Sequence, residues 1–344
     1  MTRGAFEIGG HAVEPGTRQT LHLPVSVLSD HTPVAMSVHV VHGRKPGPVM
    51  FVSASVHGDE VIGVEIVRRL LRSPAVKGLS GTLLAVPIVN AFGFMNHARY
   101  LPDRRDLNRC FPGSGRGSLA SRLAHLFTTE IVRRSTCGID LHSAAIHRTN
   151  LPQIRVSPTA PGAMELARAF GAPLVLVSRL REGSLRAAAL ALGVDVLLYE
   201  AGEGLRFDER AVRIGVVGIL RVMKSLGMIG ARGAPRLKTP SLISNDSTWV
   251  RSPAGGLMRT YKAEGERVHV GDLLGVVSDP FGEVEVEIVA RTEGVIVGRS
   301  VLPIVNEGDG IFHIATLHPD ASAAWGAVAR PFVDHPLFDE DEIV

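Results

Sequence analysis

His57 and Glu60 are three residues apart, at a point where an apolar stretch gives way to a helical pattern. On a helical turn this spacing puts an imidazole and a carboxylate on one face. Both groups are donors in catalytic zinc sites, which keep three protein ligands and leave a fourth position to water. The pair supplies two of the three protein ligands of a His2Glu metal site. It is a weak signal by itself, because a histidine and an acidic residue three positions apart also occur by chance.

A second histidine stands at the end of another apolar stretch. Asp140 and His142 follow it two residues apart, so in an extended chain they point to the same side. His142 can then supply the third metal ligand, while Asp140 is close enough to orient a group of the metal site. Two such sites at strand ends favour a metal centre over two unrelated capped strands.

Two further segments carry charged groups suited to proton transfer or to an anionic substrate. Glu200 follows four apolar residues, and a carboxylate there is costly unless it reaches a cleft, a metal or a cation. Between the histidine motifs lie Arg99, Asn108 and Arg109. Because a guanidinium matches a carboxylate in a forked geometry, these residues are candidates for binding a carboxylate or an oxyanion.

The elements that must position these groups alternate between strands and helices. Apolar runs predict strands at 49–56, 83–89, 138–141, 174–177 and 194–199, and amphipathic patterns predict helices at 61–72, 119–134, 163–170, 185–192 and 211–226. This order predicts an α/β fold, with a mixed, mainly parallel sheet flanked by helices. In such folds ligands bind beyond the carboxyl ends of the strands, where the candidate residues lie.

The chain changes character along its length. Short antiparallel strands are expected at about 10–42, within a catalytic domain that we place at 1–235. Regularly spaced glycines and short alternating segments predict an all-β domain at 236–318, followed by a C-terminal tail at 319–344. The all-β part looks like half of a barrel-sandwich domain. It reads Ser278-Asp279-Pro280 where carrier domains present a lysine, which argues against a carrier function.

Taken together, these motifs resemble the succinylglutamate desuccinylase/aspartoacylase family of zinc carboxypeptidase-like acylases. The resemblance covers roughly residues 49–202 and is carried by His57-Gly58-Asp59-Glu60, Asn90, Arg99-Tyr100, Asp106-Leu107-Asn108-Arg109, Asp140-Leu141-His142 and Glu200. It implies one Zn²⁺ per chain, held by His57, Glu60 and His142, with Glu200 as general base and acid. It also implies that Arg99 polarises the scissile carbonyl, and that Asn108 and Arg109 hold the carboxylate of an amino acid.

The segment from Arg148 to Arg155 is similar to a subgroup that includes the ectoine-pathway N-acetyl-diaminobutyrate deacetylases. This makes Arg148 and Arg155 candidate substrate contacts. The expected function is zinc-dependent hydrolysis of the amide bond of a small N-acyl amino acid. Two alternatives stay open, namely a zinc carboxypeptidase acting on short peptides and a non-catalytic binding protein with a vestigial metal site.

Composition narrows the class of protein further. The 344 residues carry 37 Lys and Arg against 34 Asp and Glu, and only 5% are aromatic, which disfavours nucleic acid as a partner. Charged residues, glycine or proline interrupt every apolar run before the ~18 residues that a membrane span requires. The start of the chain has no apolar signal segment, and two cysteines provide no disulfide framework, so we expect a cytoplasmic protein. The sequence leaves its oligomeric state open, a homo-oligomer included.

Overall fold

The computed structural model describes residues 3–317 and 325. The predicted tail at 319–344 therefore lies outside the described residues, apart from Trp325. This side chain is buried, and its indole N–H donates to the carbonyl of Gly265 at 2.8 Å.

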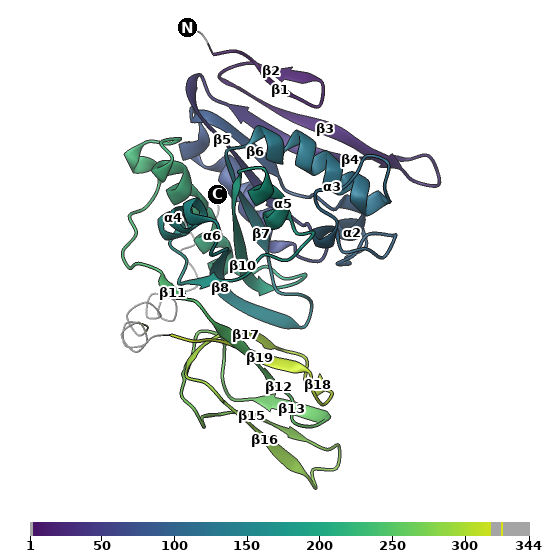
Figure 1. Cartoon of the computed structure of the whole chain (residues 1–344), viewed down its shortest axis with the longest axis vertical. Helices are drawn as coiled ribbons and strands as arrows, with labels where there is room; N and C mark the ends of the chain where they lie inside the picture. Colours follow the sequence, from purple (N-terminus) through teal and green to yellow (C-terminus); the bar gives the residue numbers. More distant parts are fainter. Residues whose placement is uncertain (1–2, 318–324, 326–344) are drawn as a thin grey trace.

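One mixed sheet runs through the molecule, in the order β12-β19-β17-β8-β10-β7-β5-β6-β4-β3 (Figure 1). Its strands before residue 245 are β3 (Thr17–Val27), β4 (Pro33–His42), β5 (Lys45–Ala54), β6 (Ser80–Val86), β7 (Cys137–His142), β8 (Arg148–Val156), β9 (Leu174–Val177), β10 (Asp195–Glu203) and β11 (Leu242–Ser244). Neighbouring strands among β6, β5, β7 and β10 run parallel, whereas β3, β4 and β8 join antiparallel. A separate hairpin precedes them, β1 (Phe6–Ile8) with β2 (His11–Val13).

Helices cover both faces of the parallel centre. They are α1 (Ile62–Arg72), α2 (Ala91–Met95), α3 (Leu119–Glu130), α4 (Pro161–Phe170), α5 (Leu185–Ala191) and α6 (Glu209–Ser225), with 3₁₀ turns η1 (Pro74–Val76), η2 (Leu107–Arg109), η3 (Val132–Arg134) and η4 (Ala231–Gly233). The core under α1, α4 and α6 contains Met50 and Val52, and the core under α3 and α5 contains Phe51. Successive side chains of β5 thus enter opposite cores, which is why this strand is apolar on both faces. The predicted α/β fold class is confirmed.

The structure differs from the sequence prediction in one element that matters for function. The sequence pattern predicts no strand at β8, whose apolar residues do not alternate and which contains Pro152. β8 pairs with β17 over residues 148–150 and with β9 over 153–156. Pro152 lies in the gap between these two ladders, where its missing N–H costs no ladder hydrogen bond.

The strands after residue 245 form an all-β unit at the lower end of Figure 1. β12 (Ser247–Arg251), β14 (Arg267–Val268), β17 (Gly294–Ser300) and β19 (Gly310–Ala315) extend the large sheet, and β13 (Gly256–Thr260), β15 (Leu273–Ser278), β16 (Glu285–Val289) and β18 (Ile304–Val305) form a second sheet. Leu274, Ile296 and Phe312 belong to a buried core shared by the two sheets. Because β17 pairs directly with β8, this unit is joined edge to edge with the α/β part. The boundary at 235/236 stays a prediction.

Candidate metal centre and substrate pocket

His57, Glu60 and His142 form one compact group of buried metal-ligating side chains. One donor atom from each residue lies within 4.8 Å of the others. His57 and Glu60 stand in the connection between β5 and α1, and His142 is the last residue of β7. Since β5 and β7 are parallel neighbours, their carboxyl ends meet at the same edge of the sheet. The three residues that the sequence analysis selected are therefore brought together.

The carboxylate of Glu60 lies between the two imidazoles. Its Oε1 is 2.7 Å from Nδ1 of His57, and its Oε2 is 2.6 Å from Nδ1 of His142. Burial by itself raises the pKa of Glu60, but the two imidazoles outweigh it and hold this pKa well below its usual range. Conversely, burial by itself lowers the pKa of each histidine, and the surrounding carboxylates outweigh it and raise both pKa values. Because both Nδ1 atoms lie within hydrogen-bond distance of the Glu60 carboxylate, the two imidazoles point toward the same group.

The opposite nitrogen of each imidazole is held by a second carboxylate. Nε2 of His57 is 3.0 Å from Oδ1 of Asp106, and Nε2 of His142 is 2.7 Å from Oδ2 of Asp140. Asp140 also accepts a hydrogen bond of 2.7 Å from the hydroxyl of Ser53. Carboxylates on the remote nitrogen fix the ring orientation of metal-binding histidines. The sequence indicates Asp106 only as part of a motif, whereas the structure shows that its carboxylate contacts His57.

The loop that carries His57 is fixed by the segment at the start of α2. Asn90 caps this helix by accepting from the N–H of Gly93 at 2.9 Å, and its own N–H donates to the carbonyl of Ser55 at 2.9 Å. A Cβ at Gly58 would lie 1.9 Å from the carbonyl carbon of Gly93. Only glycine permits this approach, so the His57-Gly58 turn is held against α2.

Glu200 enters the same pocket from β10. It is the register partner of His142 on the neighbouring parallel strand, so both side chains leave the sheet at one level. Its Oε2 accepts a hydrogen bond of 2.8 Å from the side-chain amide of Asn150, and its Oε1 lies 3.8 Å from Nε of Arg155. The register of β10 against β8 shifts between Glu200 and Gly202, which marks a bulge at the site.

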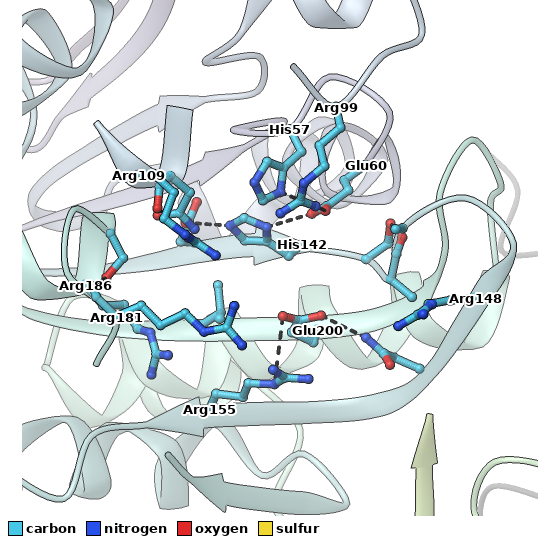
Figure 2. A pocket seen from close by; sticks show the side chains of 18 of the residues that line it. His57, Glu60, Arg99, Arg109, His142, Arg148, Arg155, Arg181, Arg186 and Glu200 are labelled. Atoms are coloured by element: carbon cyan, nitrogen blue, oxygen red, sulfur yellow. Dashed lines mark hydrogen bonds and ion pairs between the residues drawn. The ribbon is translucent and has the colours of Figure 1, made fainter. Parts of the chain in front are cut away.

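The surrounding pocket has a volume of about 230 Å³ and is rich in arginine. Figure 2 shows Arg109, Arg181 and Arg186 on one side of Glu200 and Arg148 on the other. The pocket is lined by seven arginines, Arg99, Arg109, Arg148, Arg155, Arg181, Arg186 and Arg299, against three carboxylates, Glu60, Asp140 and Glu200. Burial, followed by the charge of Arg155, lowers the pKa of Arg186 to about 10. Such an excess of positive charge favours an anionic ligand.

All the candidate substrate contacts from the sequence line this pocket, namely Asn108, Arg109, Arg148 and Arg155. The carbonyl oxygen of the Asn108 side chain accepts from the N–H of Leu185 at 2.8 Å, which leaves its amide nitrogen for a ligand. Arg99 donates to Glu60 and to Asp106, each at 3.1 Å, and so lies directly beside the proposed ligands.

Sequence reasoning gave no role to several of the lining residues. Arg186 had a local signal, because it is the one charged residue of the otherwise apolar helix α5. Trp249 and Arg299 had none, since they come from β12 and β17 of the C-terminal unit. The guanidinium carbon of Arg148 lies 5.1 Å from the ring centre of Trp249, within the range of a cation–π contact.

The fold and the donor set define an α/β protein with a His–Glu–His group at the carboxyl edge of its sheet. A family model for the succinylglutamate desuccinylase/aspartoacylase catalytic domain matches residues 46–226, and the chain belongs to this family. The resemblance stated from the motifs is therefore confirmed.

Two curated relatives carry the names of a deacetylase and a desuccinylase. N-alpha-acetyl-L-2,4-diaminobutyric acid deacetylase of Halomonas elongata is 28% identical over 307 residues, which is 86% of this chain and 90% of the relative. Succinylglutamate desuccinylase of Pseudomonas aeruginosa is 28% identical over 216 residues, 57% of this chain and 61% of the relative.

Solved structures share the architecture over most of the chain. A succinylglutamate desuccinylase/aspartoacylase from Rhodobacter sphaeroides superimposes with a TM-score of 0.78 at 25% identity, covering 88% of this chain and 96% of that one. The product-bound ectoine utilization protein from Ruegeria pomeroyi has a TM-score of 0.80 at 23% identity, covering 92% and 98%, and shows the common fold. Within residues 3–317 and 325, we find no helix with the length and apolar character needed to cross a membrane.

Proposed function

We propose that this protein is a zinc-dependent deacylase that hydrolyses the amide bond of a small N-acyl amino acid. The observation that carries the proposal is the His57–Glu60–His142 group, which shares one arginine-lined pocket with Glu200. The curated relatives support the reaction class, because one is named as a deacetylase and the other as a desuccinylase of an N-acyl amino acid.

The residues fit a zinc ion. Two imidazole nitrogens and a carboxylate are the donor set of several catalytic zinc sites, and both remote nitrogens have the carboxylate partners that such ligands need. When bound, zinc acidifies a water molecule and polarises a carbonyl group. The remaining chemistry falls to the side chains of the pocket.

Glu200 is the group that moves protons. It takes a proton from the attacking water and then delivers it to the nitrogen of the leaving amine. Arg99 donates hydrogen bonds to the carbonyl oxygen as negative charge develops there; one such donor is typically worth about 3 kcal/mol. Asn108 and Arg109 hold the α-carboxylate, and the other arginines of the pocket favour substrates with further negative charge.

The test is a hydrolysis assay with measured metal content. The purified protein is assayed with acetylated, succinylated and formylated amino acids and with dipeptides, before and after removal of metal by a chelator. We expect release of the free amino acid from N-acyl substrates, its loss on chelation and its return on addition of zinc. Preferred cleavage of dipeptides would show a carboxypeptidase instead, and a protein that binds no divalent ion would refute the proposal.

A further inference from the structure

Glu200 has one hydrogen-bond donor and one longer ion pair at its carboxylate. Within the described part of the chain, the side chain of Glu200 makes one hydrogen bond, which its Oε2 accepts from the amide nitrogen of Asn150 at 2.8 Å. The nearest cation, Nε of Arg155, is 3.8 Å from Oε1, beyond hydrogen-bond distance, and has no hydrogen-bond partner. Asn150 is therefore the one hydrogen-bond donor to this carboxylate among the described residues, and Arg155 is its longer-range charge partner.

Asn150 in turn lies against a glycine of the C-terminal unit. Gly298 on β17 is the register partner of Asn150 on β8. A Cβ at Gly298 would lie 2.5 Å from Oδ1 of Asn150, closer than real Cβ contacts allow. The backbone of Gly298 does not have a left-handed φ, so alanine would fit its conformation and would collide only with its surroundings. The space left by the missing side chain is thus filled by the Asn150 amide.

We propose that the C-terminal β unit positions the proton-transferring carboxylate, through Gly298 and Asn150. Because Gly298 has no side chain, Oδ1 of Asn150 can lie against β17 at this position. Nδ2 of Asn150 then points to Glu200. Asn150 is a positioning residue in this scheme, and its contribution is to kcat. The inference rests on the proposed role of Glu200, and it gives the C-terminal unit a part in turnover itself.

The test is a double-mutant cycle on the full-length, zinc-loaded protein. Gly298→Ala and Asn150→Ala are each expected to lower kcat about 10- to 100-fold with little change in KM, because small misplacements of a catalytic group have effects of this size. The double variant is expected to match Asn150→Ala alone, since the added methyl group then has no amide to displace. The inference is overturned if the kcat of the double variant falls by the product of the two single-variant factors. It is also overturned if Gly298→Ala has the wild-type kcat.

Gly255→Ala is the matched control. It adds the same methyl group to the same unit, but the nearest atom to its Cβ is 3.7 Å away. We expect this variant to keep the wild-type kcat, and thermal unfolding of all four variants checks that they fold. A Gly255→Ala protein as impaired as Gly298→Ala would show a general disturbance of the unit and would refute the specific contact.

Crystal structures separate this inference from the proposed function, because they do not require turnover. In Gly298→Ala we expect the Asn150 amide to have left Glu200, whereas in Gly255→Ala the contact persists. Persistence of the contact in both variants overturns the inference, whatever reaction the protein catalyses. Normal turnover by Glu200→Gln, by contrast, would refute the proposed role of Glu200 in proton transfer.

Discussion

His142 and Glu200 occupy the same level of two adjacent parallel strands, β7 and β10, as register partners. One is a proposed metal ligand and the other the proposed proton-transfer group, so a single strand pairing fixes both. The separation of the two functions by residue allows them to be tested separately.

Glu200→Gln is expected to keep its metal and lose turnover. The amide cannot take a proton from water, and general acid–base catalysis typically contributes about 10²- to 10⁴-fold, so kcat should fall by this factor. Metal content by mass spectrometry should stay at the wild-type level. His57→Ala is the contrasting variant, which should lose both metal and activity. A Glu200→Gln protein with full zinc and normal turnover would contradict the assignment.

Asp140→Asn is expected to weaken metal binding. Its carboxylate holds Nε2 of His142 at 2.7 Å, and loss of such a partner typically lowers metal affinity about 10- to 100-fold. Competition with a chromogenic chelator measures this affinity. Asp30→Asn, at the exposed turn between β3 and β4, serves as the control and should bind metal like the wild type. Equal affinity in both variants would remove Asp140 from the metal centre.

The arginines of the pocket predict a requirement for substrate charge. Arg109→Gln should raise KM for an N-acyl amino acid about tenfold or more, because hydrogen bonds to charged groups are worth about 1.5–3 kcal/mol. The α-carboxamide of the same substrate should lose this interaction already, so the variant should change its KM little. Arg259→Gln, an exposed residue of β13 that pairs with Glu285 outside the pocket, is the control. A variant that affects acid and amide equally would show that Arg109 does not contact this carboxylate.

The ion pairs of Glu65 on α1 should give the stability of the protein a defined pH dependence. Hydrogen bonding to Arg68, and then to Arg69, lowers the pKa of Glu65 to about 2, and Arg69 bridges to Glu209 on α6. The pKa of Glu65 is thus lower in the folded than in the unfolded chain, where it is about 4.3. Its contribution to stability is therefore present above about pH 4 and is lost as the pH falls toward 2.

Glu65→Gln should accordingly lower the free energy of unfolding by about 1 kcal/mol at pH 7, and by much less near pH 2.5. Urea unfolding of wild type and variant at both pH values measures the difference. Glu165→Gln, an exposed residue of α4, should show no such trend. A deficit of Glu65→Gln that grows on acidification would have the wrong sign and would contradict the assignment.

Much of the site could be predicted because its signals are local. His57, His142 and Glu200 each follow an apolar strand, and parallel strands of an α/β sheet bring such ends to one edge. The order of strands β5, β7 and β10 then determines that the three meet. Arg148 and Arg155 were found through a resemblance, although the strand that carries them was not predicted.

The sequence by itself determined the set of polar groups at the strand ends. Because the strands are buried, these groups can reach solvent only at the carboxyl edge of the sheet. The tertiary structure decided which residues from elsewhere join them. Trp249 and Arg299 reach the pocket, and Gly298 reaches Asn150, because β17 pairs with β8, a pairing between residues about 150 positions apart in the chain. Hydrogen bonding between distant strand edges leaves no periodic trace in either segment, so only the folded chain reveals that Asn150 lies between Gly298 and Glu200.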